Sequence, residues 1–123
     1  MNTATGDAVA QAVRKYDAIP FTHRAAVEGW PQPVWLSRQL YEMVDNPPRR
    51  GDDVDSRLGE LFRLIAWEYK LPLEKDRDFL IHMPTKGRTS KYIDLTLHAV
   101  GGHVIITVKG EGVTVSAYDH EHA

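Results

Sequence analysis

The sequence contains no cysteine, no long apolar run and no large excess of charge of either sign. The absence of cysteine excludes a disulfide framework, a thiol nucleophile and a cysteine-ligated zinc site. No stretch approaches the roughly 20 consecutive apolar residues needed to cross a bilayer. The first residues, MNTATGDAVAQAV, also lack the basic start and apolar core of a secretory signal. We therefore expect a soluble, cytoplasmic protein that has no membrane partner.

The charges are nearly balanced, since 15 basic and 17 acidic residues give a formal net charge of −2. A general nucleic-acid-binding protein usually carries a clear positive excess, and a mimic of DNA would need a much denser negative charge. A chain of 123 residues has the commonest size of one domain and can bury a core of its own. The sequence predicts a single domain over residues 1–123, with residues 1–6 and 119–123 loosely held.

Helical patterns dominate the first half of the chain. A short apolar stripe between Ala8 and Tyr16 predicts a first helix, and Thr22 stands where it would cap a second, short helix that Gly29 ends. A third helix is predicted from Val34 to about residue 45. The apolar residues that share one face of that helix are Leu36, Leu40, Met43 and Val44.

The clearest helical pattern runs from about residue 53 to residue 71. Apolar side chains follow the 3.6-residue period over this stretch, and Asp52 or Asp53 can cap its start. Pro72 ends it, because proline cannot continue a helix. The apolar surface is wide, so we expect this helix to lie centrally and to touch two neighbours.

In the second half the apolar period changes from 3.6 to 2, which is typical of strands. Strands are predicted at 78–83, 91–100, 103–110 and 113–118, with turns at Gly101-Gly102 and Glu111-Gly112. The first turn sets Leu97 opposite Ile106, and the second sets Ile106 opposite Ala117. The expected fold is α+β, with three to four helices followed by a three- to four-stranded antiparallel meander.

No catalytic or metal-binding motif stands out. The six histidines include no HExxH spacing, and the serines lie in no GxSxG motif. His82 and His98 are on adjacent predicted strands, and Asp94 could join them as a third ligand or as a catalytic partner. The plainer interpretation is two solvent-facing strand histidines. We therefore predict no cofactor, no metal and no catalytic residue.

The loop PTKGRTSK, residues 84–91, is the most suggestive segment. It groups Lys86, Arg88 and Lys91 around Gly87, and backbone N–H groups near a glycine can add to cationic side chains in holding a phosphate or an acidic partner. It is not a Walker loop, because the GxxxxGK[ST] order is absent and no helix follows. An ordinary exposed hairpin loop would have a similar composition.

The outer face of the predicted sheet is a second candidate surface. In the predicted register His98, Ile105 and Tyr118 form a row across three strands. An exposed Ile–Tyr pair beside a histidine is typical of an interaction patch. The alternative is that the first helix, or Trp30 and Trp35, covers this face.

Three segments, spanning roughly residues 21 to 108 in order, resemble a family of small plasmid- and phage-borne proteins of unknown function. They are FTHRAAVEG, then PVWLSRQLYEMV with SRLGELFRLIAW, then FLIHMPTKGRTSKYIDLTLHAV with HVIITV. The family usually has a longer acidic, glycine-containing insert before its final strand, and this chain has only Gly101-Gly102 there. The resemblance implies an accessory protein of a mobile element and supplies no catalytic residues.

The leading hypothesis is a small non-enzymatic binding or regulatory protein of a mobile genetic element, such as an anti-defence inhibitor. Its partner would be a host or element-encoded protein, bound through the residues singled out above: Lys86, Arg88, Lys91, His98, Ile105 and Tyr118. Nucleic-acid binding through the same loop and sheet face is a less favoured alternative. An enzyme that uses His82, His98 and Asp94 is a third. A homodimer formed through an unpaired terminal strand also stays open.

Overall fold

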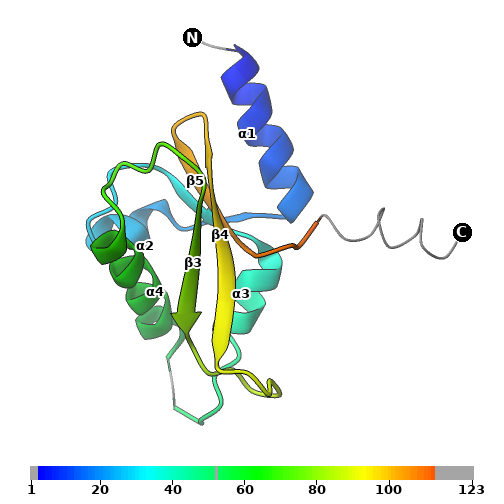
Figure 1. Cartoon of the computed structure of the whole chain (residues 1–123), viewed down its shortest axis with the longest axis vertical. Coiled ribbons are helices and arrows are strands. Elements are labelled where there is room, and N and C mark those ends of the chain that lie inside the picture. The colour runs from blue at the N-terminus through cyan, green and yellow to red at the C-terminus, as the bar shows by residue number, and fades with distance from the viewer. Residues whose placement is uncertain (1–2, 52, 113–123) are drawn as a thin grey trace, which may run out of the picture.

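The fold is built around one five-stranded mixed sheet. The computed structural model describes residues 3–51 and 53–112. Figure 1 shows the arrangement of its helices and strands. In chain order they are α1 (Thr3–Tyr16), β1 (Ile19–Pro20), α2 (Thr22–Val27), β2 (Val34–Leu36), α3 (Arg38–Val44), α4 (Val54–Glu68), β3 (Arg77–His82), β4 (Tyr92–Val100) and β5 (His103–Val108). The strand order is β1-β2-β5-β4-β3. The α+β class is therefore as expected, but the sheet is larger than the predicted meander and is not purely antiparallel.

The antiparallel hairpin of β4 and β5 has the predicted register. Leu97 lies opposite Ile106, and Thr96 lies opposite Thr107. The turn is formed by Gly101 and Gly102, which have φ values of 54° and 81°. Such positive values suit glycine, which has no Cβ to clash with the backbone. The turn glycines and the pattern of β4 thus placed this hairpin correctly, because this register sets Leu95, Leu97, Ile106 and Val108 on one face.

The predicted helix from Val34 to residue 45 is wrong in its first turn. Val34–Leu36 forms β2, which runs parallel to β5 and pairs Leu36 with Ile106. The helix starts only after Ser37, whose hydroxyl accepts a hydrogen bond from Leu40 N at 3.1 Å. A short buried strand between two other strands is apolar throughout, so its three residues fitted the helical stripe equally well.

The position of β2 also corrects the end of the predicted meander. Because the second edge of β5 is taken by β2, Ile106 cannot lie opposite Ala117. The turn after β5 comes earlier than predicted, since Glu111 N donates to Val108 O at 3.0 Å. The predicted strand 113–118 lies outside the described residues.

Helix α4 matches its prediction closely. Asp53 caps it by accepting a hydrogen bond from Asp55 N at 3.2 Å. The helix ends at Glu68, about one turn before Pro72. In α2, by contrast, Thr22 is not the cap, because its hydroxyl accepts from Val34 N at 3.2 Å and so binds β2 instead.

Helices α2, α3 and α4 pack on one face of the sheet and form the main core. Their buried side chains, with Phe62 at the centre, meet the inward-facing residues of the strands: Val34, Leu36, Ile81, Ile93, Leu95, Leu97, Val104 and Ile106. Helix α1 packs on β4 and β5, at a distance from α2 and α4 in Figure 1. Its Tyr16 stacks on His98, which follows Leu97 and therefore points to the opposite face.

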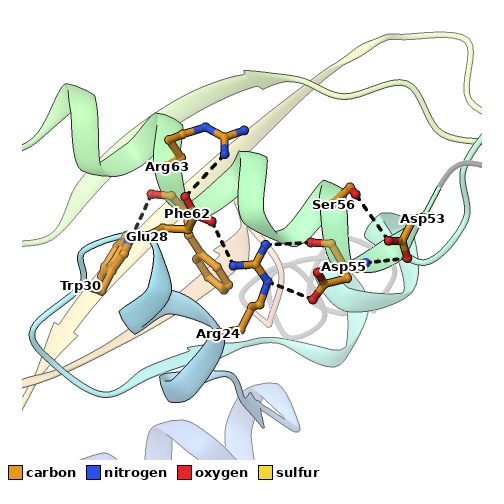
Figure 2. Close-up of polar contacts among 8 residues, drawn as sticks. All are labelled: Arg24, Glu28, Trp30, Asp53, Asp55, Ser56, Phe62 and Arg63. Carbon is orange, nitrogen blue, oxygen red and sulfur yellow. Dashed lines mark hydrogen bonds and ion pairs between the residues drawn. The ribbon is translucent and has the colours of Figure 1, made fainter.

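Arg24 of α2 ties that helix to α4, as Figure 2 shows. Its guanidinium donates to Asp55 Oδ1 at 2.9 Å, to Asp55 O at 3.2 Å and to Glu28 Oε2 at 3.0 Å. Glu28 Oε1 also accepts a hydrogen bond from Arg63 Nη1 at 3.4 Å. Trp30 Nε1 adds a buried hydrogen bond of 2.9 Å to Phe62 O. Arg24 and Glu28, both in the FTHRAAVEG segment, thus join α2 to α4.

Candidate binding surface at the basic end

Two loops lie side by side at one end of the molecule. One loop, residues 45–53, joins α3 to α4, and the other, residues 83–91, joins β3 to β4. Lys86 N donates to Asn46 O at 2.9 Å, and Asn46 Nδ2 donates to Lys86 O at 3.0 Å. Figure 1 shows both loops at the end opposite α1. We call this region the basic end, for the charges that it carries.

Arg57 is a buried residue that connects the two loops of the basic end to the core. Its side chain is almost fully buried, and its guanidinium donates to Val44 O at 2.7 Å and to Pro84 O at 2.9 Å. It thus joins the last turn of α3 to the start of the second loop. A cation at a helix C-terminus also offsets the partial negative charge of the free carbonyls there. The two loops are therefore held by buried bonds as well as by Asn46.

The two loops expose five cationic side chains: Arg49, Arg50, Lys86, Arg88 and Lys91. None of the five makes an ion pair with another residue in the described part of the chain, where the recorded pairs involve other cations. Of the described acids on these loops, Asp45 is exposed and Asp53 caps α4. The protein is acidic overall, so this end has a charge opposite to its average.

An exposed aromatic pair stands at the base of the second loop. His82 ends β3, Tyr92 begins β4, and the two lie opposite each other in the register. Their ring centroids are 5.0 Å apart at an interplanar angle of 70°. Tyr92 is 55% exposed, and Leu80, two residues before His82 on the same face, is 56% exposed. The basic end thus adjoins apolar surface.

The structure separates the predicted site residues into two groups. Lys86, Arg88 and Lys91 lie together, but His98 is six residues along β4 from Tyr92, roughly 20 Å away at about 3.3 Å per residue. The expectation of an exposed Ile105 is wrong, because its side chain is fully buried. Tyr118 lies outside the described residues.

His98 and Ile105 lie beneath α1. Tyr16 stacks on His98 with a centroid separation of 5.2 Å, and His98 Nε2 is 3.0 Å from Thr107 Oγ1. Burial lowers the pKa of His98 and outweighs the opposing effect of Asp76. This part of the outer face therefore follows the alternative in which the first helix covers it.

The arrangement that the enzyme hypothesis requires is not formed. His82 lies opposite Tyr92, Asp94 lies opposite Leu80, and His98 lies opposite Ile105, so the three side chains occupy different rows of the sheet. No group of three or more histidine and carboxylate side chains able to hold a metal occurs among residues 3–51 and 53–112.

Sequence reasoning missed the contribution of Arg49 and Arg50. The two prolines and the glycine of NPPRRGD, residues 46–52, predict the end of a helix and a turn, but they do not show which other loop lies beside this segment. Arg57 did leave a signal, since it is three residues after Val54 and four before Leu61. A charged residue at a position within the apolar stripe indicates a buried structural role.

Comparisons with known proteins give no relative to set beside this geometry: no protein-family model, no curated protein and no solved structure matches the chain. Over the described residues, no helix has the length and apolar character needed to span a membrane. The function must therefore be argued from the surface itself.

Proposed function

We propose that this chain is a non-enzymatic binding protein that engages an acidic protein surface through its basic end. The observation that carries the proposal is the pair of hydrogen bonds between Asn46 and Lys86, which holds two cationic loops together. Five exposed cations that make no ion pair in the described chain can all meet carboxylates of a partner. Guanidinium groups also bind carboxylates in a bidentate manner, which gives orientation as well as attraction.

The exposed residues beside the loops suit a protein partner. Tyr92 and Leu80 offer apolar contact area next to the cations. Interfaces commonly combine an aromatic anchor with a charged rim that sets the rate and specificity of association. Of the six residues predicted from sequence, the proposal keeps Lys86, Arg88 and Lys91 and transfers the apolar role to Tyr92.

Affinity capture from a bacterial lysate tests this function with matched baits. One bait carries Lys86→Glu, Arg88→Glu and Lys91→Glu, and its control carries three charge reversals at exposed cations elsewhere, Lys70→Glu, Lys75→Glu and Arg14→Glu. A partner that the wild type and the control retain, and that the loop variant loses, supports the proposal. Equal capture by all three baits contradicts it.

Nucleic-acid binding is a second candidate, favoured by the His82–Tyr92 pair beside the cations. Single strands bind where bases stack on aromatic rings and phosphates meet basic side chains. Anisotropy of a labelled 15-nucleotide oligo(dT) tests it, because the affinity should fall steeply as salt rises. An oligonucleotide that stays unbound at low salt removes this candidate without affecting the first.

The resemblance to plasmid- and phage-borne proteins supports a role as a mobile-element accessory factor. We include in the proposal that the acidic partner is a host or element-encoded protein, and that binding inhibits it. An anti-defence inhibitor needs no active site of its own, which suits a surface built of cations and aromatic residues. Plaque assays with and without the expressed gene in hosts that carry defined defence systems test this extension.

A further inference from the structure

A groove with an acidic rim runs between α4 and the edge of β3 and reaches the base of the second loop at His82. Its volume is about 480 Å³. The lining residues are Glu60, Leu64, Trp67 and Glu68 from α4 and Phe79, Leu80, Ile81 and His82 from β3. Trp67 is 74% exposed, although it is one of the largest apolar side chains in the protein.

The groove follows the backbone edge of β3. Four consecutive residues of the strand line it, although successive side chains of a strand point to opposite faces. Residues 79 to 82 can all border one groove only if it runs along the edge itself. β3 is the last strand of the sheet, so no other strand in the described part of the chain pairs with this edge.

The hydrogen-bonding groups at this edge belong to Leu80 and His82. Met83 N donates to Lys91 O at 2.8 Å, and in an antiparallel pair alternate residues face the partner strand. The backbone N–H and C=O groups of residues 79, 81 and 83 therefore point toward β4. Those of residues 78, 80 and 82 point away from β4, toward the open edge of the sheet. The carbonyl of Asp78 already accepts from the Tyr69 hydroxyl, which confirms this alternation.

The charges beside the groove select the occupant. Glu60 and Glu68 are exposed, make no ion pair within residues 3–51 and 53–112, and stand on either side of Leu64 and Trp67. Eight helical residues rise about 12 Å, and four residues of a strand rise about 13 Å. Two basic side chains four residues apart on a strand therefore match the spacing of these two carboxylates.

We propose that this groove binds an extended segment of a partner protein as a sixth strand. On the side that faces α4, the segment carries a basic residue, an apolar residue two positions later and a second basic residue two positions after that. Its backbone bonds to Leu80 and His82, and its apolar residue packs on Trp67. Such strand addition takes affinity from the main chain and specificity from alternate side chains.

A second copy of this chain fits the groove less well. Pairing of β3 with β3 of another copy would be isologous, so the same groove of both copies would take part in the contact. The two α4 helices would then lie on the same side of the joined sheet, with their glutamates close together. Like charges at such short range oppose association.

The test uses a labelled nine-residue peptide with the central sequence Lys-Thr-Val-Thr-Lys and its isomer Thr-Lys-Val-Lys-Thr. Binding is followed by fluorescence anisotropy, and the residues involved by amide shifts in ¹⁵N spectra. We expect the first peptide to bind at least about tenfold more tightly, equivalent to about 1.4 kcal/mol, and to shift the amides of Leu80 and His82 and the Trp67 indole. Equal affinities, or shifts away from the groove, overturn the proposal.

Two sets of variants separate strand addition from simple charge attraction. Methylation of the peptide N–H groups at alternate positions removes the donors on one edge only, so one set should abolish binding and the other should leave it intact. On the protein, Leu80→Pro removes an outward donor and no sheet bond, whereas Glu60→Gln with Glu68→Gln removes only charge. We expect each protein variant to weaken the first peptide about tenfold or more. Equal effects of both methylation sets, or a dimer in sedimentation velocity that Leu80→Pro abolishes, contradict a peptide occupant.

Discussion

The guanidinium of Arg24 lies directly over Gly59, so that a Cβ built on Gly59 would come within 2.1 Å of an Arg24 nitrogen. Glycine inside a helix normally destabilises it by about 1 kcal/mol relative to alanine. Here it opens a place in α4 where Arg24 reaches both Asp55 and Glu28. The two residues therefore form one unit, although they are 35 positions apart in the sequence.

A double-mutant cycle tests this unit. Gly59→Ala alone should leave the free energy of unfolding unchanged or lower it by about 1 kcal/mol, because displacement of Arg24 offsets the helix propensity gained. In an Arg24→Ala background the same change should stabilise by about 1 kcal/mol. Urea denaturation gives all four values. Additive effects would show that the two residues are not coupled.

Thr85 offers a second stability test. Its side chain is buried at the base of the second loop, and its hydroxyl has no hydrogen-bond partner among the described residues. Thr85→Val keeps the shape and removes the unpaired group, so the free energy of unfolding should be unchanged or rise by about 1 kcal/mol. The control is Thr107→Val, since Thr107 is buried and bonds His98. Thr107→Val should lower the free energy of unfolding by about 1 kcal/mol, because the bond to His98 is lost. A larger decrease for Thr85→Val than for Thr107→Val would contradict the prediction.

His98 should make stability depend on pH. Burial lowers its pKa in the folded protein below the ordinary value of 6.5, while Asp76 and Glu111 oppose that shift and Lys15 adds to it. Below about pH 6.5 the unfolded chain binds the proton more readily, so the free energy of unfolding falls as pH falls. The loss ends once the pH is below the native pKa of His98.

The measurement compares urea midpoints at pH 7.5 and pH 5.5 for the wild type, His98→Asn and His82→Asn. His82→Asn removes an exposed imidazole and is the matched control. His98→Asn should lose a part of the wild-type dependence on pH. An identical decrease in all three proteins would mean that His98 does not contribute.

The parts of the fold that sequence predicted are those with local signals. The β4–β5 hairpin follows from two glycines and the alternation of β4, and α4 follows from its cap and its apolar period. β2 could not be recognised, because Val34 and Leu36 are apolar in either structure and the choice depends on β5, some 70 residues later. The assignment of Ile105 to an exposed patch was also wrong because of a distant part of the chain. Helix α1, some 90 residues earlier, covers that face.

Only one of the two loops of the candidate site could be predicted from the sequence. Lys86, Arg88 and Lys91 are adjacent in sequence, and their loop had to lie between two strands. Arg49 and Arg50 join them through the bonds of Asn46 and Arg57 to main-chain carbonyls. Such bonds leave no pattern in the sequence, because any residue supplies a carbonyl.

A ¹⁵N titration of the protein with an acidic probe, a 12-residue peptide of alternating Glu and Ser, tests whether the two loops of the basic end bind as one surface. Because the Asn46–Lys86 bonds join the two loops, amides of residues 46, 49–51 and 86–91 should shift together along one binding curve, and Asn46→Ala should weaken the binding although it removes no charge. Shifts confined to one loop, or an Asn46→Ala variant that binds as the wild type does, would contradict it.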